Sequence, residues 1–424
     1  MGYRVIRRWI FIGLCSAGLI GCGTDDGPVA PWLGDRPGQG SDPLIVIADS
    51  VVAETSFVHT VTLGSGGFLF IGQDGGYEAR SLVRFNVSDT TITEFSEGTL
   101  TITFQSPQEL APTRFLLNRA SSPWTESHVT WERAMIDSLG DVAWDTPGGD
   151  IEMLPISEAG PCSLQADTVT VVFPLSRDIM TALFESGSDD CGFMIRLASE
   201  GMEHAIWRFQ SREQAVQLRP RLEFDYTDTA GTDTSKTLYA IADAALIRRI
   251  SPIDEDRLLV GSGVGFRTLL KFDLPGELDS TVTINRAELS VFCDTSRAFL
   301  DTKTLQVEFV DSTWNGDSTS VAGGYISQAL AVPGRSEITF EMTAAMVSWL
   351  ANSTDNNGLL IRSSVENNAI TYCPLFPGES GLTDLTPRLK IYYTTPPTPP
   401  IDQGSSIRDC PIKKSELRRS SDRA

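Results

Sequence analysis

The segment Arg219–Thr227, RPRLEFDYT, returns near the end of the chain as TPRLKIYYT at 386–394. In both copies a Pro-Arg-Leu start leads into alternating apolar and polar residues, which is the period of a half-buried β-strand. A second pair of segments precedes the first in the same order, because GFMIR at 192–196 matches GLLIR at 358–362. The chain therefore contains an internal repeat whose units are built from strands.

Closer to the N-terminus the repeat continues. SLVRF at 81–85 matches TLLKF at 268–272, and the dipeptide Ala48-Asp49 matches Ala242-Asp243. The matches keep one order along the chain, as a duplication of a whole domain would produce.

This order predicts two homologous domains, at 44–227 and 237–394, with the polar stretch 228–236 as a linker. Each unit has many short β-branched or aromatic runs that end at Gly, Pro, Asp or Ser. Each also has one short amphipathic segment, and Ser176 and Thr343 are the residues expected to cap these helices. The pattern predicts an all-β protein of two tandem antiparallel β-sandwiches of jelly-roll type, with one short helix each.

The N-terminus has the pattern of an export signal. Residues 1–21 carry three arginines, no acid and the apolar run WIFIGLCSAGLI, which is too short to span a bilayer. The following sequence Leu19-Ile-Gly-Cys22 resembles the bacterial lipoprotein box, which implies cleavage after residue 21 and acylation of the Cys22 thiol. Residues 22–43 are then a flexible stalk, and residues 395–424 a proline-rich spacer with a disordered basic tail.

Charge and composition limit the classes of binding partner that the protein can have. The formal net charge is −21, and because both ends of the chain are basic, the acidic excess lies in 22–394. Such a body repels phosphate backbones, so we expect no nucleic-acid partner. With three histidines in the chain, a histidine-rich metal centre is excluded. The expected location is outside the cytoplasm, at the outer membrane or cell surface, with the lipid anchor as the membrane contact.

The cysteines fit an exported protein. None of the seven forms a C-x-x-C pair, which argues against structural zinc. In an oxidising compartment we expect disulfides within each unit, between Cys162 and Cys191 and between Cys293 and Cys373. Buried free thiols are the alternative, because connectivity does not follow from sequence.

The segment Trp124-Thr-Glu-Ser-His-Val-Thr-Trp131, with Ala48-Asp49, the 81–85 strand and Pro220-Arg-Leu, resembles the DNRLRE-domain family of exported bacterial proteins. That family is related to a carbohydrate-binding module family. The resemblance covers both units and implies a β-sandwich fold with an exported modular role, and some relatives bind polysaccharide. The second unit keeps Trp314 from the tryptophan motif and has Val321 where the second tryptophan would fall.

Aromatic residues are the candidates for a carbohydrate platform, because pyranose rings stack on exposed indoles while carboxylates bind the hydroxyl groups. The alternative is that these aromatics hold a loop onto the sandwich core. The candidate carbohydrate-binding residues are Trp124, Trp131, Trp144, Tyr77, Trp207 and Glu126.

No cofactor is expected, with structural calcium as an open alternative. Asp49 and Asp225 stand near the two ends of the first unit and are the calcium candidates. Nucleophile-elbow, phosphate-loop and dinucleotide motifs are absent from the sequence, and no spacing singles out a pair of catalytic carboxylates.

The sequence therefore predicts a non-enzymatic surface lipoprotein whose tandem modules form a binding or spacer unit, with polysaccharide as the candidate ligand. The first alternative is a structural or adhesive protein that contacts other envelope proteins and binds no sugar. The second is a carbohydrate-active enzyme, a lyase or hydrolase.

Overall fold

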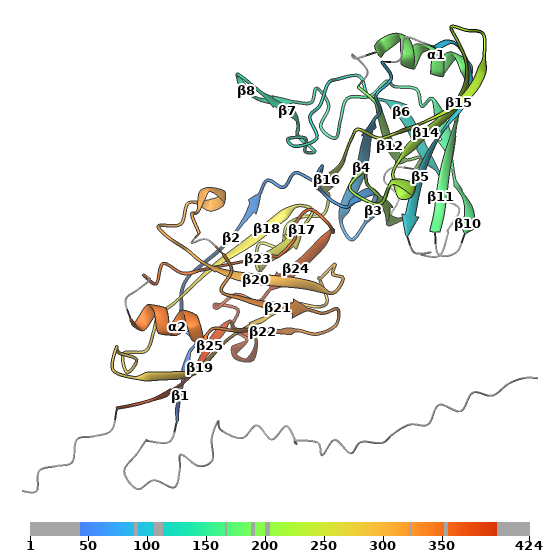
Figure 1. Ribbon diagram of the computed structural model, residues 1–424. Helices are drawn as coiled ribbons and strands as arrows, with labels where there is room; N and C mark the ends of the chain where they lie inside the picture. The colour runs from blue at the N-terminus through green and yellow to red at the C-terminus, as the bar shows by residue number, and fades with distance from the viewer. Residues whose placement is uncertain are drawn as a thin grey trace, which may run out of the picture. The chain divides into compact units, whose positions relative to one another are not determined.

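The computed structural model describes residues 43–88, 92–105, 113–165, 168–187, 191–199, 204–321, 324–351 and 355–396. The expected signal peptide, Cys22, nearly all of the stalk and the tail beyond 396 lie outside these residues, as does the side chain of Cys162. Pro43–Tyr393 forms one compact unit. Strands predominate in it and pair antiparallel, which confirms the all-β sandwich class (Figure 1). No helix among the described residues has the length and apolarity needed to cross a bilayer.

The helices of the described residues are short, α1 (Arg177–Ser186) and α2 (Thr343–Leu350), and 3-10 turns occur at η3 (Val216–Leu218), η4 (Gly316–Ser318) and η5 (Thr383–Leu385). The strands are β1 (Leu44–Ala48), β2 (Val51–His59), β3 (Phe68–Asp74), β4 (Tyr77–Arg84), β5 (Ile92–Gln105), β6 (Phe115–Arg119), β7 (Arg133–Asp137), β8 (Gly140–Ala143), β9 (Ser157–Ala159), β10 (Pro161–Gln165), β11 (Thr168–Leu175), β12 (Phe193–Leu197), β13 (His204–Gln210), β14 (Arg221–Asp228), β15 (Asp233–Tyr239), β16 (Ala242–Arg249), β17 (Leu258–Ser262), β18 (Gly265–Phe272), β19 (Thr283–Phe292), β20 (Lys303–Phe309), β21 (Ser327–Ala331), β22 (Glu337–Glu341), β23 (Leu359–Ser363), β24 (Thr371–Leu375) and β25 (Arg388–Thr394).

The first hydrophobic core is built by strands of the N-terminal repeat. β5 pairs with β11 along one edge and with β14 and the end of β13 along the other. β4 pairs with β3, β12 and β16. The helix α1 begins where expected, because the side chain of Ser176 accepts a hydrogen bond from the Ile179 N–H, and it buries Met180 and Leu183 against this core.

The second core repeats this plan. One sheet has the order β1-β25-β19-β22, another the order β2-β18-β23-β20-β21, and β17 pairs with β24. In β25 the residues Leu389, Ile391 and Tyr393 point inward in strict alternation, as the sequence predicts. In α2 the hydroxyl of Thr343 accepts a hydrogen bond from the Ala287 N–H instead of capping the helix.

The two repeats exchange their first strands. β1 and β2 come from the front of the N-terminal repeat but pair with β25 and β18 of the C-terminal repeat. In return β15 and β16 come from the front of the C-terminal repeat and pair with β14 and β4 of the N-terminal repeat (Figure 1). Each sandwich is therefore completed by two strands that belong to the other repeat in sequence.

This pairing crosses the domain boundaries expected from the repeat. The segment 228–236, expected to be a linker, is the end of β14, a hairpin turn at 229–232 and the first residues of β15. The carboxylate of Asp228 accepts hydrogen bonds from the Ala230 and Thr232 N–H groups in this turn. Gly231 adopts a positive φ of 74° in this turn. Small polar residues serve hairpin turns and flexible linkers alike, so the composition of the segment does not separate the two.

The exchange also revises the alignment of the repeats. Asp243 lies opposite Val83 in β4, and the residue opposite the matching Leu270 of β18 is Glu54. The structural counterpart of Asp243 is therefore Glu54, not Asp49 as the Ala-Asp match predicts. A two-residue match carries too little information to fix a strand register.

Candidate functional site

The tryptophans expected to form a sugar platform are buried. Trp124, Trp131 and Trp144 are 2%, 4% and 4% exposed and pack in one cluster with Met194 and Leu246. The indole of Trp124 donates a hydrogen bond to the Cys191 carbonyl at 2.8 Å. An indole with both faces packed cannot stack on a pyranose ring, so the exposed platform predicted from these three residues is wrong.

Trp131 packs against two charged side chains. The guanidinium carbons of Arg80 and Arg248 lie 4.9 and 4.7 Å from its ring centroid, and both arginines form ion pairs with Glu78. Arg80 stands on β4 and Arg248 on the exchanged strand β16. The arrangement therefore fastens the segment between β6 and β7 that carries Trp124 and Trp131, the tryptophan loop, across the β4–β16 pair.

Tyr77 and Trp207, the remaining aromatic candidates, are core residues as well. Tyr77 is fully buried, and burial raises the pKa of its hydroxyl strongly. Trp207 is 2% exposed and meets Phe104 and Phe115 edge to face, with ring centroids 5.3 and 6.2 Å apart. Neither side chain presents a face to solvent, so neither can be part of a surface platform.

Glu126 belongs to a different kind of site. A carboxylate oxygen of Glu126, one of Glu213 and one of Asp243 all lie within 4.8 Å of one another. Glu126 comes from the tryptophan loop, Glu213 from the loop after β13 and Asp243 from the start of β16. Arg212 joins the cluster, since its Nε lies 2.8 Å from Glu126 Oε1 and 3.1 Å from Glu213 Oε1.

Asp243 is the buried member of this cluster. It is 0% exposed, and its Oδ2 accepts a hydrogen bond from the Arg212 N–H at 2.7 Å. Burial raises the pKa of Asp243 to about 8, and the charges of Glu213 and Glu126 add to the rise. Burial also raises the pKa of Glu126. All donors of the cluster are oxygen atoms, which suits a hard cation such as calcium.

The two aspartates expected near calcium have other neighbours. Asp49 follows β1, which pairs with β25, whereas Asp225 lies opposite Ser235 in the β14–β15 pair. The Ser235 hydroxyl donates a hydrogen bond to Asp225 Oδ1 at 2.6 Å. The strand exchange thus moves β1, and Asp49 with it, to the edge of β25 and away from the strand that carries Asp225. In the sequence Asp243 stands out only as the repeat match of Asp49, and no motif marks Glu213 as a metal ligand.

The cysteines of the second repeat meet in its core. Cys293 and Cys373 are both 1% exposed, with their Sγ atoms 3.0 Å apart as thiols. This contact gives the predicted pair the proximity that a disulfide needs. Cys191 lies at the edge of the tryptophan cluster, and its expected partner Cys162 has no described side chain.

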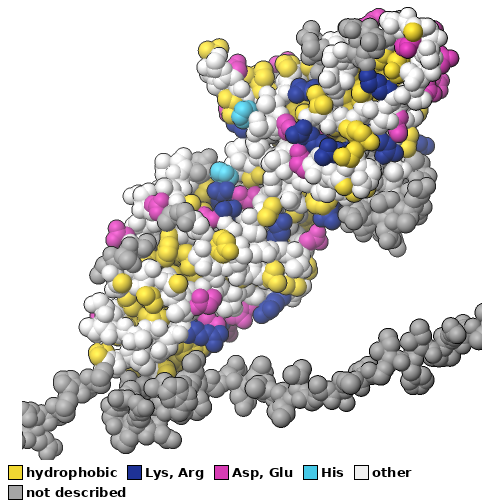
Figure 2. Space-filling view, in the orientation of Figure 1, with side chains coloured by type: hydrophobic (Ala, Val, Ile, Leu, Met, Phe, Trp, Pro, Cys, Tyr) yellow, Lys and Arg dark blue, Asp and Glu magenta, His cyan; other side chains and the backbone are white. Residues whose placement is uncertain are grey.

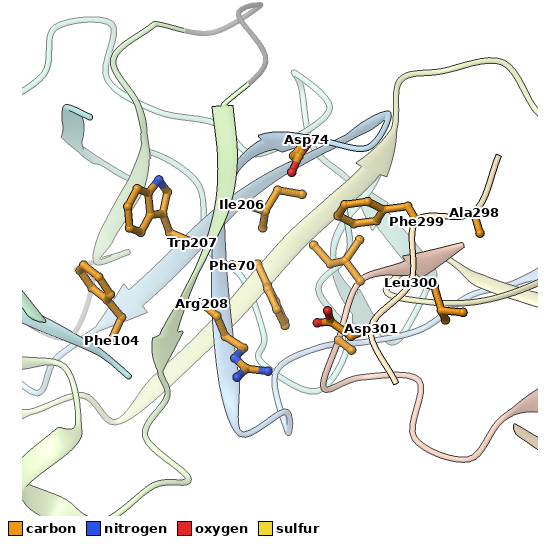
Figure 3. Close-up of a pocket in the computed structure, with 12 residues that line it drawn as sticks. Phe70, Asp74, Phe104, Ile206, Trp207, Arg208, Ala298, Phe299, Leu300 and Asp301 are labelled. Carbon is orange, nitrogen blue, oxygen red and sulfur yellow. The ribbon is translucent and has the colours of Figure 1, made fainter. Parts of the chain in front are cut away.

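A pocket of about 460 Å³ lies beside β13 (Figure 3). Phe70, Ile206 and Phe299 form its apolar wall, and Arg208 and Asp301 are among its charged residues. Figure 3 shows Trp207, which also contributes to the lining, on the opposite side of β13 from Ile206. In this pocket aromatic and charged side chains meet a cavity of ligand size.

The charged surface is mixed. On the face shown in Figure 2, acidic and basic side chains lie among each other, with apolar side chains scattered between them.

No family model matches the chain, and no curated protein matches it.

Proposed function

We propose that the protein is an exported, lipid-anchored envelope protein whose two interlocked sandwiches form a non-enzymatic structural and spacer unit. The observation that carries this proposal is the reciprocal exchange of β1–β2 and β15–β16. Separating the two repeats would require breaking four strand pairings. A load that pulls one sandwich from the other is carried by the crossovers 60–67 and 250–257, whose flanking strands are hydrogen-bonded into both sandwiches. Two beads on a flexible linker would separate under the same load.

The tryptophans support a structural role in both repeats. Trp314 Nε1 donates to the Asn357 carbonyl at 2.7 Å, and Trp124 Nε1 donates to the Cys191 carbonyl at 2.8 Å. Each acceptor stands directly before the glycine that opens the matching strand, Gly192 or Gly358. The same contact recurs in both sandwiches, as expected for a residue that holds a loop in place and not for one that binds a ligand.

The anchoring part rests on the N-terminal sequence. Expression in a bacterium with a labelled fatty acid should label the wild-type chain and leave Cys22→Ser unlabelled. The wild type should require detergent for release from membranes, and Cys22→Ser should be released without it. A mature wild-type chain that still starts at Met1 and carries no lipid would refute the anchor.

Polysaccharide binding is the second candidate function, and the pocket beside β13 is the observation that favours it. Phe299 is partly exposed there and can stack on a sugar ring, while Arg208 and Asp301 can bind hydroxyl or carboxylate groups. Burial and the nearby Arg208 charge lower the pKa of Lys303, so a second cation lies close to the pocket. Asp74 also lines the pocket, so its two carboxylates balance these two cations, and the set can bind the hydroxyl groups of a neutral sugar.

Affinity gels with neutral and acidic polysaccharides test this second function. Retardation of the wild type that disappears in Phe299→Ala would support it. The control is Tyr325→Ala, which removes an aromatic side chain that is 57% exposed and does not line the pocket. No retardation by any polysaccharide would remove the sugar ligand, and release of shortened products would instead favour a lyase or hydrolase.

A further inference from the structure

The cluster of Glu126, Glu213 and Asp243 has one buried oxygen without a partner. The whole Asp243 residue is 0% exposed, and its Oδ1 is shielded from solvent. This oxygen has no hydrogen-bond partner among the described residues. A buried carboxylate oxygen without a hydrogen bond or a cation is costly. Packing alone does not explain why Asp243 Oδ1 is buried without a partner, and its burial points to a bound cation.

The net charge of the cluster also calls for a bound cation. Three carboxylates and the guanidinium of Arg212 sum to a charge of −2 when all are ionised. The ion pairs of Arg212 use Oε1 of Glu126 and Oε1 of Glu213, so the second oxygen of each glutamate can turn toward an ion. A divalent cation would neutralise the cluster without displacing Arg212.

We infer that Glu126, Glu213 and Asp243 bind a calcium ion, which fixes the exchanged strand β16 to the loops of the first sandwich. The separation within the cluster agrees with this ion, because ligands bound to calcium at 2.3–2.6 Å lie at most about 5 Å apart. One carboxylate oxygen from each of the three residues lies within 4.8 Å of the other two. The side chains of Glu126 and Glu213 are 21% and 29% exposed, so the ion has a path from solvent.

The second sandwich supplies an internal comparison. Glu54 stands where Asp243 does, but both of its oxygens accept hydrogen bonds from the Gly378 N–H, at 3.1 and 2.9 Å. Glu379 follows Gly378 as Glu213 follows Arg212, whereas Gly316 stands two residues after Trp314, where Glu126 follows Trp124. The second sandwich therefore lacks the third carboxylate, and the proposed site belongs to the first sandwich alone.

Terbium luminescence on the full chain tests the site, since Trp124 lies two residues from Glu126 and can sensitise a bound lanthanide. The wild type should show terbium emission that calcium displaces, and calcium should raise its thermal unfolding midpoint more than magnesium does. Asp243→Asn and Glu213→Gln should each weaken calcium binding at least about tenfold. Glu213 is exposed, so its variant reports on binding even if Asp243→Asn does not fold.

The matched controls are Glu54→Gln and Glu379→Gln, the same changes at the corresponding positions of the second sandwich. They should leave the calcium affinity within about twofold of the wild-type value. A wild type that binds neither terbium nor calcium would overturn the proposal. So would a Glu213→Gln protein that binds calcium as the wild type does, or a Glu54→Gln protein that loses affinity equally.

Discussion

Replacing Leu246 by alanine tests the strand exchange directly. Leu246 belongs to the C-terminal repeat in sequence, but it stands on β16 and packs with Trp124, Trp131 and Met194 of the N-terminal repeat. If each repeat kept its own strands, this substitution would loosen the second sandwich. With exchanged strands it must loosen the first.

The magnitude follows from the burial of the side chain. Leu246 is 0% exposed, and a fully buried leucine that becomes alanine costs about 3–5 kcal/mol of unfolding free energy. The upper part of this range is expected, because the cluster that holds Leu246 contains the rigid indole rings of Trp124 and Trp131, which cannot easily collapse into the cavity. Urea unfolding followed by tryptophan fluorescence measures the loss.

Hydrogen exchange with mass spectrometry locates the loss. In Leu246→Ala, amide protection should fall in β4, β12 and the tryptophan loop, while β18 to β25 keep theirs. The reciprocal variant is Phe57→Ala on β2, where Phe57 packs against Leu269 and Leu360 of the second sandwich. It should cost about 2 kcal/mol, since this ring is only partly buried, and lower protection in β18 and β23. Val52→Ala, at a position that is 53% exposed, is the control for both. If Leu246→Ala left the first sandwich protected and exposed the second, the strand assignment would be refuted.

Three further outcomes follow from the fold and the cluster. A protease site inserted after Gly231 should give two fragments that stay together in gel filtration without denaturant, and separation on cleavage would contradict the exchange. In the exported protein Cys293 and Cys373 should form a disulfide and resist alkylation until they are reduced. Cys293→Ser should then lower the unfolding free energy by about 4–5 kcal/mol. Ready alkylation of both thiols in unfolded, unreduced protein would exclude the disulfide. Without metal, the raised pKa of Asp243 means that the folded state holds a proton which the unfolded state releases near pH 4, so its contribution to stability is complete below pH 4 and is lost as the pH rises through about 8. The unfolding free energy of the wild type relative to Asp243→Asn should therefore fall by up to about 1.4 kcal/mol per pH unit across this range in EDTA, and a constant difference would rule out the buried acid.

Features that depend on local sequence were predicted well. The alternation after Pro387 gave the buried face of β25, and Ser176 marked the start of α1, because period and capping are set by neighbouring residues. The all-β class followed from many such segments. In α2 Val347 is 48% exposed and Trp349 is 5% exposed, so Trp349 and not Val347 lies on the inner face of this helix.

Features that depend on distant partners were not predicted. Strand sequence indicates which side chains are buried but not which edge the strand joins, so the exchange of β2 and β16 left no signal. The tryptophans show the same dependence on distant partners. Trp131 is of the residue type that forms sugar platforms, but Arg80 and Arg248 pack over its ring and make it a core residue. The carboxylate cluster unites three distant segments, and only the fold brings Glu213 to Asp243.

The exchange also determines how many copies the molecule can contain. The chain has the connectivity of a domain-swapped dimer whose two subunits share a single backbone, with crossovers at 60–67 and 250–257. Each copy donates a pair of strands to the other and accepts a pair in return, so the arrangement closes on itself at two. A third copy appended to the gene would find no donor and would have to fold alone, whereas deletion of either copy would leave the survivor incomplete unless it recruited a second molecule.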